Sequence, residues 1–222
     1  MKILGINASP RGSKSQTLRL VKTVLNGARS RRGCEVEFVD LCKLNVEYCE
    51  ACGVCYKSGK CRKKDDFQSL YQRILSADGL VMGSPTYFRL VSAQMKTLFD
   101  RMADAVHCQL LTGKYTVNVA TSGGLHNDRE VTKYLNGIML TFGSYVTGST
   151  GTSVALGSGA MDAVEKKAFR LGKKLAEDIR ARRVYLRQER IHKENSKYFR
   201  QLVEMNKDEW IHEYDFWSRQ KR

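Results

Sequence analysis

The chain has few of the residues that divide a polypeptide into separate pieces. It contains two prolines among 222 residues, and no Ser/Gly/Pro-rich linker interrupts it. No internal repeat is visible, which excludes a repeat architecture. A chain of this length can bury a full core without disulfide staples. We therefore expect one main domain.

Long apolar runs are also missing. None approaches the ~20 residues that are needed to span a bilayer. The opening residues, MKILGINASPRG, reach glycine after four positions, which predicts neither a signal peptide nor a membrane anchor. The sequence thus predicts a soluble, cytoplasmic protein without a membrane partner.

The common nucleotide and hydrolase signatures are absent. Neither G-x-x-x-x-G-K-[ST] nor G-x-G-x-x-G occurs. No Ser/His/Asp or paired-carboxylate arrangement suggests hydrolysis. Acidic residues are scarce beside basic ones, and the formal net charge is +15. A surface this basic attracts polyanions such as an acidic protein or a nucleic acid, although it can equally serve solubility alone.

Cysteine is rare except in one stretch. Cys34, Cys42 and Cys108 are isolated and read as core or loop residues. The other four cysteines fall in CEACGVCYKSGKC, with the spacing C-x2-C-x2-C-x5-C. An odd total in a cytosolic protein argues against a disulfide framework.

This spacing suits an iron–sulfur cluster better than zinc. Zinc sites usually place two C-x2-C pairs about 15 residues apart, and here no room is left for a second pair. Three thiols at three-residue intervals can surround a cluster that a nearby fourth thiol completes. Arg62 stands where ferredoxin-type runs have proline. Structural zinc and redox-active or unmetallated thiols remain the alternatives.

Apolar segments alternate with helical patterns along the chain. We expect strands at 3–8, 34–41, 78–83, 115–124 and 144–153, and helical segments between and after them, the last over 160–183. Five strands in such alternation predict an α/β fold with a doubly wound parallel sheet. Ligands of these sheets bind at the carboxyl ends of the strands. The turns after the first, third and fourth strands and the cysteine loop at 46–66, after the second strand, should meet there.

Two of these turns have the composition of a flavin site. In SPRGSKSQT, hydroxyl groups and one arginine precede a helix, which suits a terminal phosphomonoester such as that of FMN. In SPTYF, a Pro-Thr-aromatic sequence offers a wall and a stacking surface for a flat ring. A helix cap in a solvated turn and a turn with core aromatics are the respective alternatives.

SPRGSKSQT, GSPTYFRLVSAQMKTLFDR and the cysteine run together resemble the iron–sulfur flavoproteins, a branch of the flavodoxin-like NADPH-dependent FMN reductase family. The resemblance covers roughly residues 1–185. It implies one FMN and one [4Fe-4S] cluster per chain, a homodimer or homotetramer, and electron exchange with ferredoxin. Arg89-Leu90 departs from the small or polar pair that many relatives have there, which affects access to the flavin.

The resemblance also assigns site residues. The FMN phosphate would be held by Ser9, Arg11, Ser15, Gln16 and Thr17. The isoalloxazine ring would be bordered by Pro85, Thr86, Tyr87 and Phe88 and, on its other edge, by Gly123 and Gly124. The cluster ligands would be Cys49, Cys52, Cys55 and Cys61.

Residues 186–222 continue beyond a five-stranded sheet and contain both tryptophans of the chain. Aromatic anchors of this kind favour protein interfaces. We expect a flavodoxin-like FMN-binding domain over 1–185 and a C-terminal helical arm over 186–222 at a subunit interface. An independent partner-binding segment is the alternative.

The predicted function is an electron-transfer flavoprotein, a flavin-dependent oxidoreductase. Ferredoxin or a similar donor, the cluster and FMN would exchange electrons, and a small acceptor such as dioxygen, peroxide or a quinone would be reduced. A directly NAD(P)H-dependent FMN or quinone reductase is one alternative. A redox-sensing regulatory protein that binds nucleic acid is another, but it does not require the flavin turns, so nucleic acid is not expected as a partner.

Overall fold

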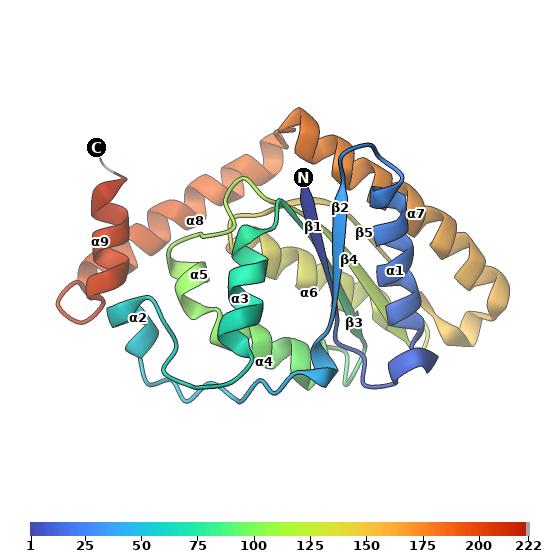
Figure 1. The fold of residues 1–222 in the computed structure, drawn as a ribbon, viewed down its shortest axis with the longest axis horizontal. Helices are drawn as coiled ribbons and strands as arrows, with labels where there is room; N and C mark the ends of the chain where they lie inside the picture. Colours follow the sequence, from blue (N-terminus) through green and yellow to red (C-terminus); the bar gives the residue numbers. More distant parts are fainter. Residues whose placement is uncertain (221–222) are drawn as a thin grey trace.

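A five-stranded parallel sheet forms the centre of the molecule (Figure 1). The computed structural model describes residues 1–220. The strands lie in the order β2-β1-β3-β4-β5, which is the flavodoxin-like doubly wound order. Their bounds are β1 (Lys2–Asn7), β2 (Glu35–Asp40), β3 (Gly79–Pro85), β4 (Tyr115–Ser122) and β5 (Tyr145–Ser153). The predicted fold is confirmed, with strand ends that differ from the expected ones by one or two residues.

Helices cover both faces of this sheet. On one face lie α1 (Gln16–Arg29) and α7 (Ser158–Ala181), whose apolar side chains share one core cluster. The other face is covered by α3 (Phe67–Ser76), α4 (Ala93–Arg101), α5 (Ala103–His107) and α6 (Asn127–Thr141). Every residue of β4 is buried, as expected for a central strand covered on both faces.

Two glycines let α1 and α7 pack closely. A Cβ atom at Gly27 would lie 2.1 Å from the Phe169 carbonyl oxygen, and one at Gly172 would lie 1.9 Å from that of Val24. Both distances are far below contact, so any side chain would push the helices apart. This close crossing fixes the first helix, and with it the turn that precedes its N-terminus.

Short elements connect the main ones. These are the 3-10 turns η1 (Gly12–Lys14), η2 (Leu41–Lys43) and η3 (Val154–Leu156) and the one-turn helix α2 (Val54–Ser58). The carboxyl ends of the strands face the lower side of Figure 1, where the loop after η2 also runs.

The C-terminal arm consists of α8 (Leu186–Met205) and α9 (Ile211–Arg219), which fold back over the domain (Figure 1). The first of these helices contacts α5 and α6, and the second contacts α2, in the cysteine loop. That the arm also lies at a subunit interface stays a prediction. Within residues 1–220, no helix combines the length and the apolar character that a membrane crossing requires.

Candidate functional site: a flavin cradle and a cysteine cavity

The turn after β1 is shaped by a glycine and a helix cap. Gly12 has a φ of 53°, a left-handed conformation that glycine adopts without steric cost. Ser15 is the N-cap of α1, and its hydroxyl oxygen accepts a hydrogen bond from the Leu18 N–H at 3.0 Å. The turn therefore brings the N-terminus of α1, with its free backbone N–H groups, to the carboxyl edge of the sheet.

The turn after β3 is a tight hairpin. The backbone N–H groups of Tyr87 and Leu90 each donate to the other residue's carbonyl oxygen at 2.9 Å. Phe88 and Arg89, the two residues between them, have φ values of 46° and 69°. Two successive positive φ angles are typical of a type I′ turn but are strained in residues other than glycine.

A double ion pair holds this strained turn. The Arg89 guanidinium donates from Nε to Glu130 Oε2 at 2.8 Å and from Nη2 to Oε1. Glu130 lies in the first turn of α6. Arg89 therefore pairs with α6 instead of lining the cradle.

Thr121, at the end of β4, joins the turns. Its hydroxyl lies 2.6 Å from that of Thr17 in α1, and its carbonyl oxygen accepts from the Thr86 N–H at 2.8 Å. Both hydroxyl oxygens are buried. These bonds fix the relative positions of three segments that are far apart in the sequence.

The turns enclose one cavity, which we call the flavin cradle. It is lined by Ser9, Arg11, Gln16, Thr17, Pro85, Thr86, Tyr87, Thr121, Ser122, Gly123 and Val154. Most of the residues predicted for FMN thus lie together. Ser15 caps the helix and lines the neighbouring hollow, Gly124 follows the lining glycine, and the Phe88 side chain is fully exposed.

Three lining residues were not predicted. Thr121 and Ser122 end the β4 strand, directly before the glycine turn that was predicted to border the ring. Their position at a carboxyl strand end was a usable signal. Val154 follows β5, and nothing in its local sequence marks it.

The lining chemistry fits FMN. Arg11 is the one charged residue among those that line the cradle, and it accompanies the hydroxyls of Ser9 and Thr17. The Gln16 side-chain oxygen is buried without a hydrogen-bond partner among residues 1–220. A buried polar atom of this kind is favourable only when a ligand or water pairs with it. Hydroxyl and guanidinium donors suit a phosphate, and the half-exposed Tyr87 offers a ring face.

The cysteine loop turns at two glycines. Gly53 and Gly59 have φ values of 68° and 71° and flank α2 at its two ends. This one-turn helix carries Cys55, and the second glycine turns the chain back toward Cys61. The spacing C-x2-C-x5-C therefore places cysteines before, within and after a compact turn.

All four loop cysteines line a second cavity, the cysteine cavity. Its lining comprises Cys49, Glu50, Ala51, Cys52, Gly53, Cys55, Tyr56, Cys61, Arg62, Lys63, Asp100, Arg101 and Ala103. Burial raises the pKa of the Cys55 thiol to about 12, and the carboxylates of Asp104 and Glu213 add to the rise. The Cys55 thiolate therefore needs a compensating positive centre.

The four cysteines match an iron–sulfur cluster in number and chemistry. A [4Fe-4S] cluster is held by four cysteine thiolates, and four cysteines line this cavity. In the described part of the chain, no three His, Cys, Asp or Glu side chains come close enough together to hold a single metal ion.

Helix α9 packs against the cysteine loop. Trp210, just before this helix, packs on the Tyr56 ring with 4.7 Å between centroids and stacks on His107. The fully buried Glu213 hydrogen-bonds His107 Nδ1 at 3.0 Å. A Cβ atom at Gly59 would lie 2.5 Å from the His212 ring. The C-terminal arm therefore forms one wall of the cysteine loop of its own chain.

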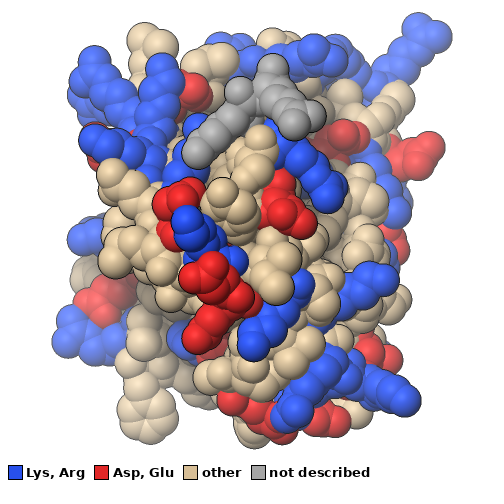
Figure 2. Space-filling model, turned by 90° about the vertical axis from the view of Figure 1, so that its left-hand side faces the viewer, with Lys and Arg blue, Asp and Glu red and all other residues tan. Residues whose placement is uncertain are grey.

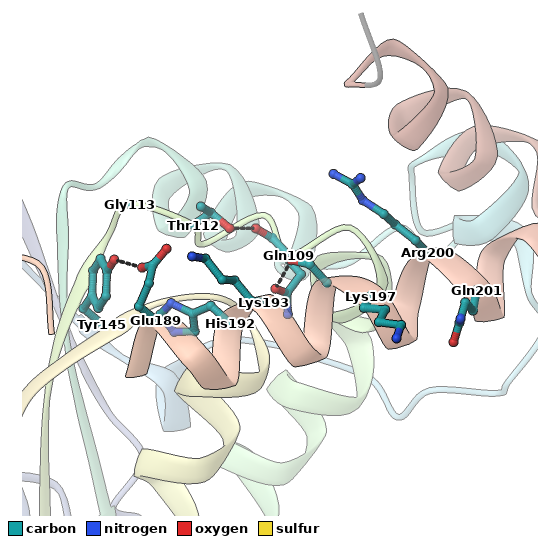
Figure 3. A pocket seen from close by; sticks show the side chains of 11 residues that line it. Gln109, Thr112, Gly113, Tyr145, Glu189, His192, Lys193, Lys197, Arg200 and Gln201 are labelled. Atoms are coloured by element: carbon teal, nitrogen blue, oxygen red, sulfur yellow. Dashed lines mark hydrogen bonds between the residues drawn. The ribbon is translucent and has the colours of Figure 1, made fainter. Parts of the chain in front are cut away.

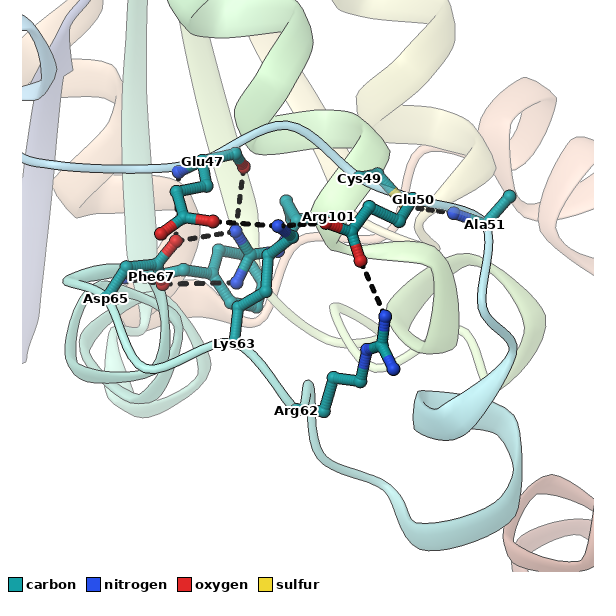
Figure 4. Close-up of polar contacts among 9 residues, drawn as sticks. All are labelled: Glu47, Cys49, Glu50, Ala51, Arg62, Lys63, Asp65, Phe67 and Arg101. Carbon is teal, nitrogen blue, oxygen red and sulfur yellow. Dashed lines mark hydrogen bonds and ion pairs between the residues drawn. The ribbon is translucent and has the colours of Figure 1, made fainter.

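Part of the loop's positive charge is neutralised locally (Figure 4). Lys63 pairs with Glu47 and Glu50, and Arg62 pairs with Glu50 at 2.7 Å. The hydrogen bonds from Lys63 and Arg62 lower the pKa of Glu50 to about 2. Lys57, Lys60 and Lys64 make no ion pair within residues 1–220, so they carry the loop's remaining positive charge.

Helix α4 connects the two cavities. At its N-terminus, Ser92 accepts from the Met95 N–H and donates to the Ala8 carbonyl oxygen at 2.8 Å, next to the turn after β1. At its C-terminus, Arg101 lines the cysteine cavity. Helix α4 therefore begins beside a turn that lines the flavin cradle and ends at the cysteine cavity.

A larger cavity lies between α8 and the opposite, amino edge of the sheet (Figure 3). Some of its polar groups bond one another: the Tyr145 hydroxyl donates to Glu189, and the Ser196 hydroxyl donates to Gln109 at 3.0 Å. Lys193 and Lys197 line it as well. None of the predicted site residues lies there, and its internal hydrogen bonds attach the arm to the domain.

Figure 2 shows the face on the left of Figure 1. Lys and Arg side chains spread over most of it, with Asp and Glu side chains among them. On this face the positive charge is therefore dispersed rather than gathered in one stripe, so this face gives no particular support to a nucleic-acid groove.

Comparison with known proteins identifies the class. The family described as NADPH-dependent FMN reductase matches residues 1–158, and the chain belongs to this family.

Solved structures with known names agree on the fold. A flavone reductase has a TM-score of 0.64 at 22% identity, over 81% of this chain and 63% of that one. An FMN-dependent NADH-azoreductase of Bacillus anthracis, solved in complex with FMN, has a TM-score of 0.64 at 17% identity, over 79% of this chain and all of that one (100%).

Within the family, the chain falls in the iron–sulfur flavoprotein branch. An iron–sulfur flavoprotein of Archaeoglobus fulgidus is 35% identical over 180 residues, which are 80% of each chain. Another, of Methanocaldococcus jannaschii, is 34% identical over 191 residues, 81% of this chain and 98% of that one. The recognition from sequence is confirmed, and the protein is a flavin-dependent oxidoreductase.

Proposed function

We propose that the protein is an iron–sulfur flavoprotein that binds FMN and a [4Fe-4S] cluster and transfers electrons from a one-electron donor such as ferredoxin to a small acceptor. The acceptor would be dioxygen, peroxide or a quinone. The observation that carries this proposal is that all four loop cysteines line one cavity, in a chain whose strand-end turns line the flavin cradle. When bound, the two groups would supply one-electron and two-electron redox chemistry.

The residues of the cradle would bind and orient the flavin. Ser9, Arg11 and Thr17, with the N-terminus of α1, would hold the phosphate, and Ser15 would keep that terminus in place. Gln16 would pair its buried oxygen with a hydroxyl group of the ligand. Pro85-Thr86-Tyr87 and Gly123 would border the ring on opposite sides.

The residues of the cysteine loop would hold the cluster. Cys49, Cys52, Cys55 and Cys61 would each supply one thiolate. Tyr56, covered by Trp210, would keep water from the inner side, whereas Cys49 and Cys52 lie on the exposed side. A donor protein would approach from that exposed side, where Lys57, Lys60 and Lys64 favour an acidic surface.

Assembly and location belong to the same proposal. Several large apolar side chains on the arm are exposed, among them Leu186 at 77%, Tyr198 at 60% and Met205 at 83%. Exposed apolar groups on one element support a subunit interface, so we place a homodimer or homotetramer contact there. All seven cysteines are free thiols, which supports the reducing cytoplasm as the compartment.

A directly NAD(P)H-dependent quinone or FMN reductase is the second candidate. It is favoured by the family description and by a relative from Delftia acidovorans named FMN-dependent NADH:quinone oxidoreductase, 25% identical over 82% of this chain and 94% of that one. The half-exposed Tyr87 would leave room for a nicotinamide beside the flavin.

Anaerobic purification tests the proposal. We expect a visible spectrum of flavin plus iron–sulfur absorption, four irons and four sulfides per FMN within about 20%, and faster flavin reduction by reduced ferredoxin than by NADPH. Zinc in the loop or stoichiometric FAD would contradict the cofactor assignment. Faster reduction by NADPH or NADH would favour the second candidate.

A further inference from the structure

One arginine connects the two ends of the cysteine loop. Arg101, the last residue of α4, donates from Nη1 to the Glu47 carbonyl oxygen at 2.7 Å (Figure 4). The same guanidinium contacts both carboxylate oxygens of Asp65, at 2.7 and 3.1 Å. Glu47 precedes the first ligand cysteine and Asp65 follows the last, so this contact closes the loop at its base.

The carboxylate of Asp65 completes this closure. It accepts hydrogen bonds from the backbone N–H groups of Glu47 at 2.9 Å and Phe67 at 3.1 Å. The guanidinium of Arg101 lies 4.5 Å from the centre of the Phe67 ring, a cation–π contact. The Arg101 guanidinium is therefore held by the Phe67 ring as well as by the hydrogen bonds of its nitrogen atoms.

This ion pair is almost completely buried. The exposed fractions of the Arg101 and Asp65 side chains are 1% and 0%. A buried pair adds little net stability, because desolvation offsets most of the attraction, but the removal of one partner is strongly destabilising. Its physical effect here is to hold the two loop ends in one arrangement.

Arg101 also reaches the sulfur ligands. It lines the cysteine cavity together with Cys61, and its Nε atom is buried without a hydrogen-bond partner among the described residues. An arginine guanidinium stays protonated at any physiological pH. A permanent cation thus lies beside the cavity.

We propose that Arg101 is a positioning residue for the cluster: it fastens the loop ends through Asp65 and Glu47 and sets a fixed positive charge beside the Cys61 sulfur. This inference rests on the proposed function, because it assumes that the loop cysteines hold the cluster. A positive charge and N–H donors beside a cluster favour its reduced form, so Arg101 raises the reduction potential. It also keeps the ligands in place when solvent competes for iron.

The test compares Arg101→Gln with Arg62→Gln in anaerobically purified holoprotein. Both changes remove one positive charge from the lining of the same cavity, but Arg62 is 56% exposed and, within residues 1–220, forms an ion pair with Glu50 alone. The measurements are the cluster midpoint potential, the electron paramagnetic resonance spectrum of the reduced cluster, and iron release to a chelator. FMN content and the circular dichroism spectrum show whether each variant is folded.

We expect Arg101→Gln to give a more negative potential and an altered resonance spectrum, with iron release faster by about tenfold or more, the usual effect of losing a residue that orients metal ligands. Arg62→Gln should change each readout much less. Arg101→Lys keeps the charge but not the planar fork, so its potential should stay near the wild-type value while iron is still lost faster. If Arg101→Gln fails to fold, the rate of iron release from Arg101→Lys tests the proposal instead: faster release supports it, and a wild-type rate contradicts it.

Two results would distinguish a failure of the proposed role of Arg101 from a failure of the proposed function. Wild-type protein that contains no iron and sulfide would overturn the proposed function and the inference together. A wild-type cluster whose potential and iron release are matched by Arg101→Gln, or are changed equally by Arg62→Gln, would overturn only the role of Arg101.

Discussion

The flavin cradle and the cysteine cavity lie at the same edge of one sheet but are built in different ways. The cradle consists of short turns that directly follow strands, so the sheet itself determines where they lie. The cysteine cavity belongs to a loop that leaves the sheet and is held by Arg101 of α4, His107 of α5 and the C-terminal helix α9. A site made of strand-end turns depends on the sheet, whereas a site on a long loop depends on remote side chains.

This difference predicts that the two sites can be damaged independently. Changes to the loop or to its remote supports should remove the cluster and leave FMN in place. Changes to the turns should weaken FMN and leave the cluster intact.

The largest effect is expected from Cys52→Ala. With three ligands left and no Met or His in 46–66 to replace the fourth, the cluster should be lost or degraded while FMN remains bound. Reduction of the flavin by ferredoxin should stop, although a small chemical reductant should still bleach it. The matched control is Cys42→Ala, which lies outside the cavity and should keep full iron. Unchanged ferredoxin-dependent turnover in Cys52→Ala would contradict the electron route.

Removal of residues 206–222 should have the next largest effect. The truncation deletes Trp210, His212 and Glu213, which cover Tyr56, Gly59 and His107. We expect most of the iron to be lost while FMN content changes little, as measured by iron and flavin assays. Light scattering tests the assembly prediction on the same sample. Truncated protein with full iron would show that the loop does not need α9.

A smaller effect is expected from Arg11→Ala. Loss of a charge-assisted hydrogen bond to the phosphate should weaken FMN binding by about 1.5–3 kcal/mol. Fluorescence titration of apoprotein with FMN measures it, and iron content should be unchanged. Lys14→Ala is the control, because Lys14 lies in the same turn but does not line the cradle. Equal losses in both variants would point to a general effect of charge.

The smallest effect is expected from Thr17→Val. It removes the hydroxyl that lies 2.6 Å from Thr121 and leaves that partner buried without its bond. We expect a loss of about 1–2 kcal/mol, seen both in FMN affinity and in thermal unfolding. Thr23→Val, at a partly exposed position of the same helix, should change neither by more than about 0.5 kcal/mol. Unaltered FMN binding in Thr17→Val would mean that the cradle does not depend on this cross-link.

Much of the molecule could be predicted because its signals are local. Apolar runs such as ILGINA indicated buried parallel strands, and the alternation with helices indicated the sheet. Most of the turn residues predicted for FMN line one cavity because strand ends converge in any such sheet, whatever the details of packing. The family recognition rested on the same local motifs and is confirmed.

The rest depended on contacts between segments that are far apart in the sequence. Val154 and Thr121 reach the cradle because β5 and β4 lie next to one another, and Phe88 points to solvent because the hairpin after β3 is tight. The expected role of the arm did not include a contact with its own cysteine loop, since the order of its aromatic residues does not indicate which surface they cover.

By itself, the sequence determined the parallel sheet, the capped turn before α1 and the set of four neighbouring thiols, because strand burial, helix capping and cysteine spacing act within a few residues. Only the tertiary structure decided what holds the thiols in place. Arg101 contacts Asp65, 36 residues away in the sequence, and Glu213 contacts His107, 106 residues away. These contacts exist only once the sheet and its helices have brought the side chains into a common low-dielectric interior. There an unpaired charge is too costly, so each group is fixed by its partner.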